Sequence, residues 1–425
     1  MIKGYQLDSS YFEEIKSEVV GLLSRYIKID TSHPPGDTGQ AIEFLKELFE
    51  KEGISYKVYE YSREKKSIIA WLKNDDSKEK PLLLLNHMDV VAADKSKWAF
   101  DPLSGDVEDG YIRGRGALDM KGMAIAQLMS LIIAKRKGIR LKRGLMVLFV
   151  ADEEIGGFHG AKYIVDNFFN EIDPEVVLDE GGFGYDLLGK KQLFLVSCSQ
   201  KKSLWLRIRA KGTSGHGSQP IKENPNNILL AALDKLSGYQ WPIEKDSRLR
   251  LLFRYLVGKD KAGFEFLNTL VSNTLAITTL YSGDTINVIP STAEATLDCR
   301  LFPHTDVESV LSQLNKVIND HRIEIEVVKR TDEVVISDFE SCFLRNIQNV
   351  LNSNFNNAKL IPFITPVGTD SKYFRQKGVQ SYGLFPIFLN LDDLRTIHGV
   401  NEKISIDNLL LGTKLVHEIC INYCM

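Results

Sequence analysis

The sequence predicts an α/β fold, with a mostly parallel sheet covered by helices and a smaller α+β domain inserted into it. Short, continuously apolar runs alternate with helical patterns in the first half of the chain, as strands buried on both faces do. From about Lys191 the pattern becomes β–α–β–β–α–β, which is typical of a small sheet with two helices on one side. After about Glu333 the helix–strand alternation of the first half returns.

Length and composition fit two globular domains. The chain has 425 residues, of which 44% are hydrophobic and 26% charged, and this is too long for one ordinary core. We therefore expect a discontinuous catalytic domain over residues 1–190 and 333–425, with residues 191–332 inserted as the second domain. An extra helical segment near residues 242–270 interrupts the second domain.

The elements of the first half follow from apolar spacing and from capping residues. Apolar positions at helical spacing predict a helix over residues 11–27, and a second helix should run from an Asp37 N-cap to a stop at Gly53. The stretch KGMAIAQLMSLIIAKRKG predicts a long apolar helix closed by glycine. Three buried strands are expected in PLLLLNHMD, GLMVLFVADEE and EVVLDEGG, which end near Asp89, Glu154 and Glu180.

The inserted domain contains six elements. Strand patterns occur in LFLVSCSQKKSLWLRIRAKG, TLAITTLYSGD, STAEATLDCRLF and RIEIEVVKR. Helical patterns occur in NPNNILLAALDKLSG and TDVESVLSQLNKVIND. Their order along the chain predicts a ferredoxin-like α+β domain.

Charge and hydropathy exclude several classes of function. The net charge is −3, the pI is near 6.3, and acidic and basic residues are interspersed, so no basic face for nucleic acid is expected. No apolar run approaches the roughly 20 residues that span a bilayer, and the N-terminus resembles a folded helix more than a signal peptide. The five cysteines are scattered without a CxxC pair, which disfavours a cysteine zinc site and fits a cytoplasmic location.

Acidic residues cluster at the ends of the three expected strands. Ligand sites in parallel sheets form beyond the carboxyl ends of the strands, so these groups should converge on one crevice. So many carboxylates are costly to place together unless cations neutralise them. Each motif alone has a plain reading: a polar turn for His-x-Asp, a helix N-terminus for Asp-Glu-Glu, a cap for Asp119 and a loop residue for His398. Together they indicate a metal site.

The motifs also resemble a known family. The ordered set comprises HMDVV, GRGALDMKG, ADEEIGG, LDEGG, TSGHGS, NVIPSTAEATLDCR, GTDSKYF and HGVNEKIS. It resembles the metallopeptidase family of acetylornithine deacetylase, succinyl-diaminopimelate desuccinylase, aminoacylase and glutamate carboxypeptidase, over nearly the whole chain. The resemblance implies a zinc-binding catalytic domain with a smaller lid domain.

The resemblance implies a ligand set for two metals. His87 and Glu180 would bind the first metal and Glu154 and His398 the second, with Asp119 bridging both. Glu180 is preferred to Asp179 because the acidic ligand of the family precedes the glycine of this motif. Zinc suits these oxygen and imidazole ligands, and manganese or cobalt stay open. Relatives also carry a non-proline cis peptide after the bridging aspartate, here Asp119–Met120.

Catalytic roles are implied in the same way. Asp89 would be the carboxylate that orients the His87 ring. Glu153 would be the general base, taking a proton from a water whose pKa the metals lower towards about 7 and later protonating the leaving amine. His216, in a polar glycine-rich loop, would reach the substrate of a partner subunit and help to stabilise the oxyanion.

The resemblance also implies substrate contacts. Asn287 and Arg300 would contact substrate, with the arginine gripping a carboxylate, although Arg300 could instead form a surface ion pair. Thr369 and Asp370 would shape the site. Two departures from the family pattern, His33 in place of asparagine and Ala92 in place of proline, lie outside the metal set.

We therefore expect a metal-dependent hydrolase that cleaves an amide bond of small N-acyl-amino acids or short peptides with a free carboxylate, and a homodimer joined through the lid. Deacylase and dipeptidase or carboxypeptidase activities both stay open, and the extra segment near residues 242–270 favours a peptidase. The alternatives are a non-catalytic binding or assembly protein that keeps the fold, and a single structural metal site. The first alternative predicts losses among the base and ligands, and none is missing. The second would not need Glu153 beside a complete ligand set.

Overall fold

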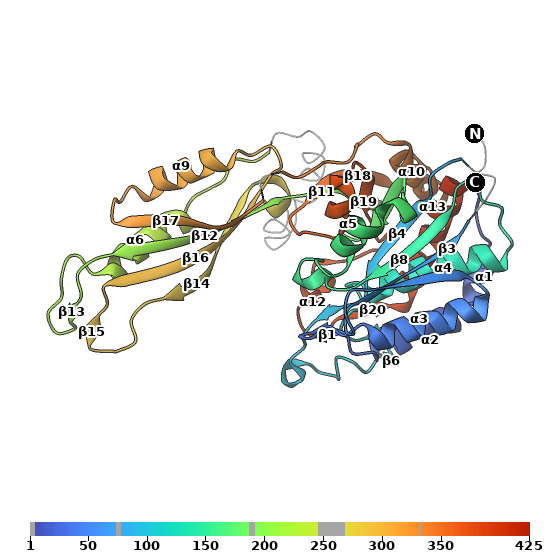
Figure 1. Cartoon of the computed structure of the whole chain (residues 1–425), viewed down its shortest axis with the longest axis horizontal. Helices are drawn as coiled ribbons and strands as arrows, with labels where there is room; N and C mark the ends of the chain where they lie inside the picture. The colour runs from blue at the N-terminus through green and yellow to red at the C-terminus, as the bar shows by residue number, and fades with distance from the viewer. Residues whose placement is uncertain (1–4, 74–77, 187–191, 245–267, 332) are drawn as a thin grey trace. The chain divides into compact units, whose positions relative to one another are not determined.

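The chain divides into two compact units, Met1–Ser199 with Ile336–Met425 and Gln200–Val335 (Figure 1). The structure is a computed structural model that describes residues 5–73, 78–186, 192–244, 268–331 and 333–425. Most of the extra segment expected near residues 242–270 lies outside these residues. Among the described helices, none is long and apolar enough to cross a membrane.

A mixed sheet forms the centre of the larger unit. Its middle strands are parallel, in the order β19, β9, β4, β8. Antiparallel strands β11 and β10 flank them on one side and β3 and β2 on the other, a common arrangement at the edges of α/β sheets. A further strand, β18, pairs with β11. The strands are β2 (Ser55–Glu60), β3 (Lys66–Leu72), β4 (Leu82–His87), β8 (Leu145–Val150), β9 (Val176–Asp179), β10 (Gly184–Asp186), β11 (Gln192–Gln200), β18 (Lys359–Thr365) and β19 (Gln380–Gly383).

Helices cover both faces of this sheet, as the unbroken apolar strands require. Along β4, Leu82 and Leu84 pack into one hydrophobic cluster, whereas Leu83 and Leu85 pack into another on the opposite face. The first cluster contains α2, α3, α4, α10 and α13, and the second contains α5 and α11. These helices are α2 (Lys16–Ile27), α3 (Gly39–Glu52), α4 (Lys121–Arg136), α5 (Ala161–Ile172), α10 (Cys342–Asn354), α11 (Ser371–Gln376) and α13 (Ile406–Cys424).

Two of the expected helices differ in detail from the helices of the structure. The helix expected over residues 11–27 is divided at Ile15 into α1 (Ser9–Glu14) and α2. The N-cap of α3 is Thr38, so the prediction of Asp37 was wrong by one residue; the Asp37 carboxylate still accepts the Gly39 N–H at 2.8 Å. The helix ends at Gly53 as expected, where φ is 60°.

The smaller unit is an antiparallel sheet with helices packed on one face. Its strand order is β14-β16-β12-β17, which together with the β–α–β–β–α–β sequence order is a ferredoxin-like arrangement. Alternate residues of β12, from Leu204 to Ala210, are buried with apolar residues of α6 and α9. The elements are β12 (Lys202–Lys211), β13 (Gly215–His216), α6 (Pro225–Ser237), β14 (Thr274–Tyr281), β15 (Val288–Ile289), β16 (Thr292–Leu301), α9 (Val307–Ile318) and β17 (Ile323–Arg330).

Short elements complete the larger unit near the carboxyl ends of the parallel strands. A two-residue parallel pair joins β1 to β5, and a small sheet has the order β20-β7-β6. These elements are β1 (Ser32–His33), β5 (Val90–Val91), η1 (Lys95–Lys97), β6 (Val107–Glu108), β7 (Tyr111–Arg113), η2 (Glu153–Ile155), α12 (Leu391–Thr396) and β20 (Lys403–Ser405).

Candidate metal centre and active site

The parallel strands bring the acidic motifs to one edge of the sheet. His87 is the last residue of β4, and Glu153 and Glu154 follow β8 within four residues. Glu180 comes directly after β9. Because β9, β4 and β8 are parallel neighbours, their carboxyl ends meet at the same edge.

The five residues expected to bind metal lie together, in two halves that share Asp119. His87 Nε2 is 3.1 Å from Asp119 Oδ1 and 3.5 Å from Glu180 Oε1. On the other side, His398 Nε2 is 3.1 Å from Asp119 Oδ2 and 3.0 Å from Glu154 Oε2. Each oxygen of the Asp119 carboxylate therefore faces a different histidine.

The structure separates the two adjacent acids at the end of β9. Asp179 Oδ2 accepts the Ser371 N–H at 3.0 Å, so its carboxylate is occupied away from the histidine. Glu180 carries the carboxylate close to His87. The peptide bond between Asp119 and Met120 is cis, as the family resemblance predicts.

A buried carboxylate that sequence reasoning missed, Glu402, holds the loop before Asp119. Its Oε1 accepts the N–H groups of Leu118 at 2.7 Å and Asp119 at 3.1 Å. Its Oε2 accepts the Gly116 N–H at 3.0 Å and Arg115 Nη1 at 2.7 Å. The sequence signal for this residue was weak: Glu402 and Arg115 occur in two of the quoted motifs, but the two residues lie 287 positions apart in the chain.

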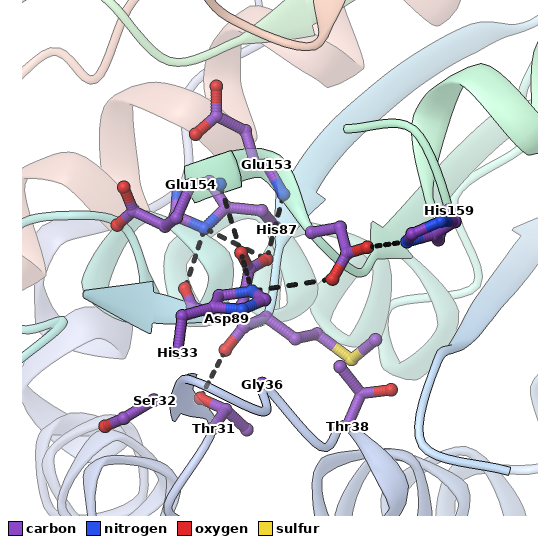
Figure 2. A network of polar contacts seen from close by, with 12 residues as sticks. Thr31, Ser32, His33, Gly36, Thr38, His87, Asp89, Glu153, Glu154 and His159 are labelled. Atoms are coloured by element: carbon purple, nitrogen blue, oxygen red, sulfur yellow. Dashed lines mark hydrogen bonds and ion pairs between the residues drawn. The ribbon is translucent and has the colours of Figure 1, made fainter. Parts of the chain in front are cut away.

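Asp89 acts on its neighbours differently from the expected role. His87 Nδ1 lies 2.9 Å from the Asp89 main-chain oxygen but 3.8 Å from its Oδ1. The main-chain carbonyl therefore orients the ring, which corrects the assignment to the carboxylate. The Asp89 carboxylate instead accepts the N–H groups of Glu153 at 3.2 Å and Glu154 at 3.1 Å (Figure 2).

These bonds fix the main chain of Glu153 and Glu154 and the orientation of the His87 ring. A carbonyl oxygen only accepts, so the bond to Asp89 places the hydrogen of His87 on Nδ1 and leaves Nε2 facing the carboxylates. Figure 2 shows the Glu153 and Glu154 side chains pointing in different directions. A donor atom of Glu153 lies in a group with those of His87 and Glu180, all within 4.8 Å of one another.

The electrostatics of the cluster favour a bound cation. Burial raises the pKa of Glu153, and burial together with Asp119 raises that of Glu180. Hydrogen bonds that His398 donates to the Asp119 and Glu154 carboxylates raise the pKa of His398 to about 10. The clustered carboxylates thus favour protonation of themselves or of the histidines. A bound metal ion would supply the positive charge that these protons otherwise provide.

The donor atoms themselves also fit metal ions. The set is two imidazoles and three carboxylates without a thiolate, which suits zinc and similar ions. Two donors bound to one tetrahedral ion lie about 3.3 Å apart, close to the separations of 3.0–3.5 Å found here. Glu154 Oε1 is buried without a hydrogen-bond partner among the described residues, and an ion would supply one.

The predicted substrate residues of the smaller unit lie at its two-stranded β13–β15 sheet and on β16. His216 pairs with Val288 in this antiparallel pair, and the Gly217 N–H donates to the Asn287 carbonyl at 2.7 Å. His216 is exposed, and its Nδ1 accepts the Ser218 N–H at 3.2 Å. Arg300 forms a forked pair with Asp298, both bonds at 2.9 Å, so the surface ion pair left open from sequence is present.

Thr369 and Asp370 are buried in the larger unit, beside the strand ends. The Thr369 hydroxyl lies 2.7 Å from that of Ser371. Neither carboxylate oxygen of Asp370 has a hydrogen-bond partner among the described residues, and burial raises its pKa to about 7. A side chain at Gly157, where φ is 74°, would collide with Asp370, so the loop after Glu154 packs closely against this residue.

Comparisons with known proteins agree with this geometry. The model of peptidase family M20/M25/M40 matches residues 83–422. A mouse protein (Mus musculus) named N-fatty-acyl-amino acid synthase/hydrolase PM20D1 is 28% identical, over 98% of this chain and 90% of that protein. Aminoacylase-1 from Sus scrofa is 29% identical, over 87% of this chain and 86% of that protein. The crystal structure of the metallo-carboxypeptidase Sso-CP2 from Sulfolobus solfataricus superimposes with a TM-score of 0.72 at 22% identity, covering 96% of this chain and 99% of that one.

Proposed function

Because the chain belongs to peptidase family M20/M25/M40 and is a metallo-amidohydrolase, we propose that it hydrolyses an amide bond of small N-acyl-amino acids or short peptides with two metal ions and Glu153 as general base. The observation that carries the proposal is the division of the ligands into two halves across Asp119. One half contains His87 and Glu180, and the other contains His398 and Glu154.

The residues of the site divide the chemistry between them. Divalent cations held there, zinc by preference, would supply Lewis-acid activation of a water and of the amide carbonyl. Glu153 takes the proton of the attacking water and returns it to the leaving amine. Its raised pKa, caused first by burial, suits a group that both accepts and donates a proton. The Asp89 carboxylate holds the main chain of Glu153 in place.

The relatives and the smaller unit support the proposed substrate class. The similar proteins include one named for N-fatty-acyl-amino acids and an aminoacylase, which favours a deacylase. The similar metallo-carboxypeptidase supports a peptidase as the second candidate. In either case Asn287 and Arg300 would contact the substrate, with Arg300 exchanging Asp298 for the substrate carboxylate.

Assembly and location complete the proposal. We propose a homodimer joined through the smaller unit, in which His216 reaches the substrate of the partner subunit. The bond from the Ser218 N–H to Nδ1 favours a hydrogen on Nε2, where it can be donated to an oxyanion. The cysteines at all five positions are free, which fits a reducing, cytoplasmic location.

A substrate panel with metal analysis tests the function. N-acetyl-, N-succinyl- and long-chain N-acyl-amino acids and dipeptides would be incubated with the protein loaded with zinc, manganese or cobalt. We expect about two metal ions per chain and hydrolysis of at least one class, with a chelator-treated sample as control. A folded protein that binds no metal and cleaves no substrate would favour the non-catalytic alternative, and one metal without hydrolysis would favour a structural site.

A further inference from the structure

Two buried carboxylates adjoin the proposed base, Glu153: one precedes it in the chain and the other binds its main chain. Asp89 and Asp152 are both 0% exposed, and Asp152 immediately precedes Glu153. Three basic side chains surround them, and together these five residues form what we call the rear cluster: His33, Lys65, Asp89, Asp152 and His159. None of the five belongs to the expected metal-ligand set, and only Asp89 had an expected role.

His33 is the member of the rear cluster that connects the two acids. Its Nε2 lies 3.0 Å from Asp89 Oδ2 and 3.5 Å from Asp152 Oδ1. Lys65 and His159 pair with Asp152 and not with Asp89. Lys65 contacts Asp152 Oδ1, and His159 contacts Oδ2. The shorter contact makes Asp89 the hydrogen-bond partner of His33. This bond is the main influence that holds the pKa of Asp89 below its usual range against the effect of burial.

The main chain around His33 is fastened to the strand end that carries the metal site. The Ser32–His33 segment pairs in parallel with Val90–Val91, and Thr31 Oγ1 donates to the Met88 carbonyl at 2.7 Å (Figure 2). The imidazole also lies against Gly36, where an added Cβ would come within 2.3 Å of the ring. The position of the ring is therefore set by its own turn, and the ring can in turn fix the carboxylate that it binds.

We propose that His33 is a positioning residue, which holds the Asp89 carboxylate so that its two oxygens fix the main chain of Glu153 and Glu154. The chain of bonds runs from His33 Nε2 to the Asp89 carboxylate and from there to the two N–H groups. His33 touches neither the metal ligands' donor atoms nor, in the proposed mechanism, the reacting atoms. The inference rests on the proposed function, because it assigns its effect to the placement of the base.

A simpler role for His33 is to neutralise buried charge. In that case the substitution would lower stability and leave turnover unchanged, as should a substitution of His159, which pairs with Asp152 but has no bond to Asp89. The two histidines thus form a matched pair. Both lie beside buried acids of the rear cluster, and only one contacts the carboxylate that binds the catalytic loop.

The experiment compares His33→Leu, His33→Asn and His159→Leu with the wild type. We expect His33→Leu to lower kcat by about 10- to 100-fold, the usual effect of removing a supporting hydrogen bond, with KM within about threefold and metal content unchanged. His33→Asn, whose amide can still donate to Asp89, should recover kcat to within about threefold of the wild type. His159→Leu should leave kcat within about threefold. A kcat for His33→Leu equal to that of His159→Leu would overturn the proposal.

Amide hydrogen exchange provides a readout that needs no substrate. The N–H groups of Glu153 and Glu154 should exchange at least tenfold faster in His33→Leu, and at the wild-type rate in His33→Asn and His159→Leu. If the wild type hydrolyses nothing, the proposed function fails while this measurement still tests the positioning. If His33→Leu does not fold, His33→Asn decides the matter, because fast exchange or a tenfold loss of kcat in that variant contradicts the role of the donated bond.

Discussion

Replacing Glu402 by glutamine should destabilise the larger unit and loosen the bridging aspartate. The carboxylate accepts four hydrogen bonds from fully or partly buried donors, three of them main-chain N–H groups and one from Arg115. In Glu402→Gln one oxygen becomes an NH₂ group, so two of these bonds are lost. At about 1.5–3 kcal/mol for each bond to a charged group, the loss is about 3–6 kcal/mol. Breaking a buried ion pair costs about 3–5 kcal/mol, which agrees.

Thermal unfolding measures this loss. For a domain of this size, about 2 °C per kcal/mol gives a fall in Tm of roughly 6–12 °C. Metal affinity should also fall, because the Asp119 N–H is one of the groups that Glu402 binds. The matched control is Glu108→Gln, which makes the same change in an exposed Glu108–Arg113 pair of the same unit and should cost less than about 1 kcal/mol. Equal Tm values for the two variants would refute the idea that Glu402 holds this loop.

Four further outcomes are expected. Glu153→Gln should keep its metal and lose about 10²–10⁴-fold in kcat, and near-normal turnover would remove Glu153 as the base. His87→Ala and His398→Ala should each lower the metal content found by elemental analysis; unchanged stoichiometry in both would exclude them as ligands. Co-expression of His216→Ala with Glu153→Gln should restore activity to at most one site of each heterodimer, whereas an inactive, proven heterodimer would contradict action in trans. Burial lowers the pKa of His417 to about 4, below the unfolded value of about 6.5. The contribution of neutral His417 to the free energy of unfolding is therefore fully present above pH 6.5, and about 3 kcal/mol of it is lost as the pH falls to 4. His417→Gln should flatten this decline in acid-unfolding curves, and an unchanged curve would show that His417 is not its source.

Prediction from sequence succeeded where the placement of a side chain follows from its position at the end of a strand. His87, Glu154 and Glu180 could be grouped because the ends of parallel strands share an edge, and no contact needed to be known. The fold class and the family were confirmed. The N-cap of α3 was placed one residue too early, because the helix begins at Gly39; the Asp37 side chain accepts the Gly39 N–H, as a capping residue would, but Thr38 is the residue at the N-cap position.

The supporting residues could not be predicted, because their partners are distant in the chain. Glu402 lies 287 residues from Arg115, and His33 lies 56 residues from Asp89. No periodicity or motif spacing reports such a pair. The contacts of Asp89 could not be predicted from the sequence either. Whether its carboxylate or its main-chain oxygen binds the His87 ring depends on the local backbone conformation.

The sequence by itself determined the fold class, the family and the meeting of the acidic motifs at one sheet edge, because buried strands and ordered motifs are properties of residue type and pattern. Only the tertiary structure decided how these groups are held. The two oxygens of Asp119 face two histidines, and the Asp89 carboxylate binds the main chain of Glu153. The reason is physical: hydrogen bonds act over about 3 Å, and chain folding alone determines which distant residues come that close.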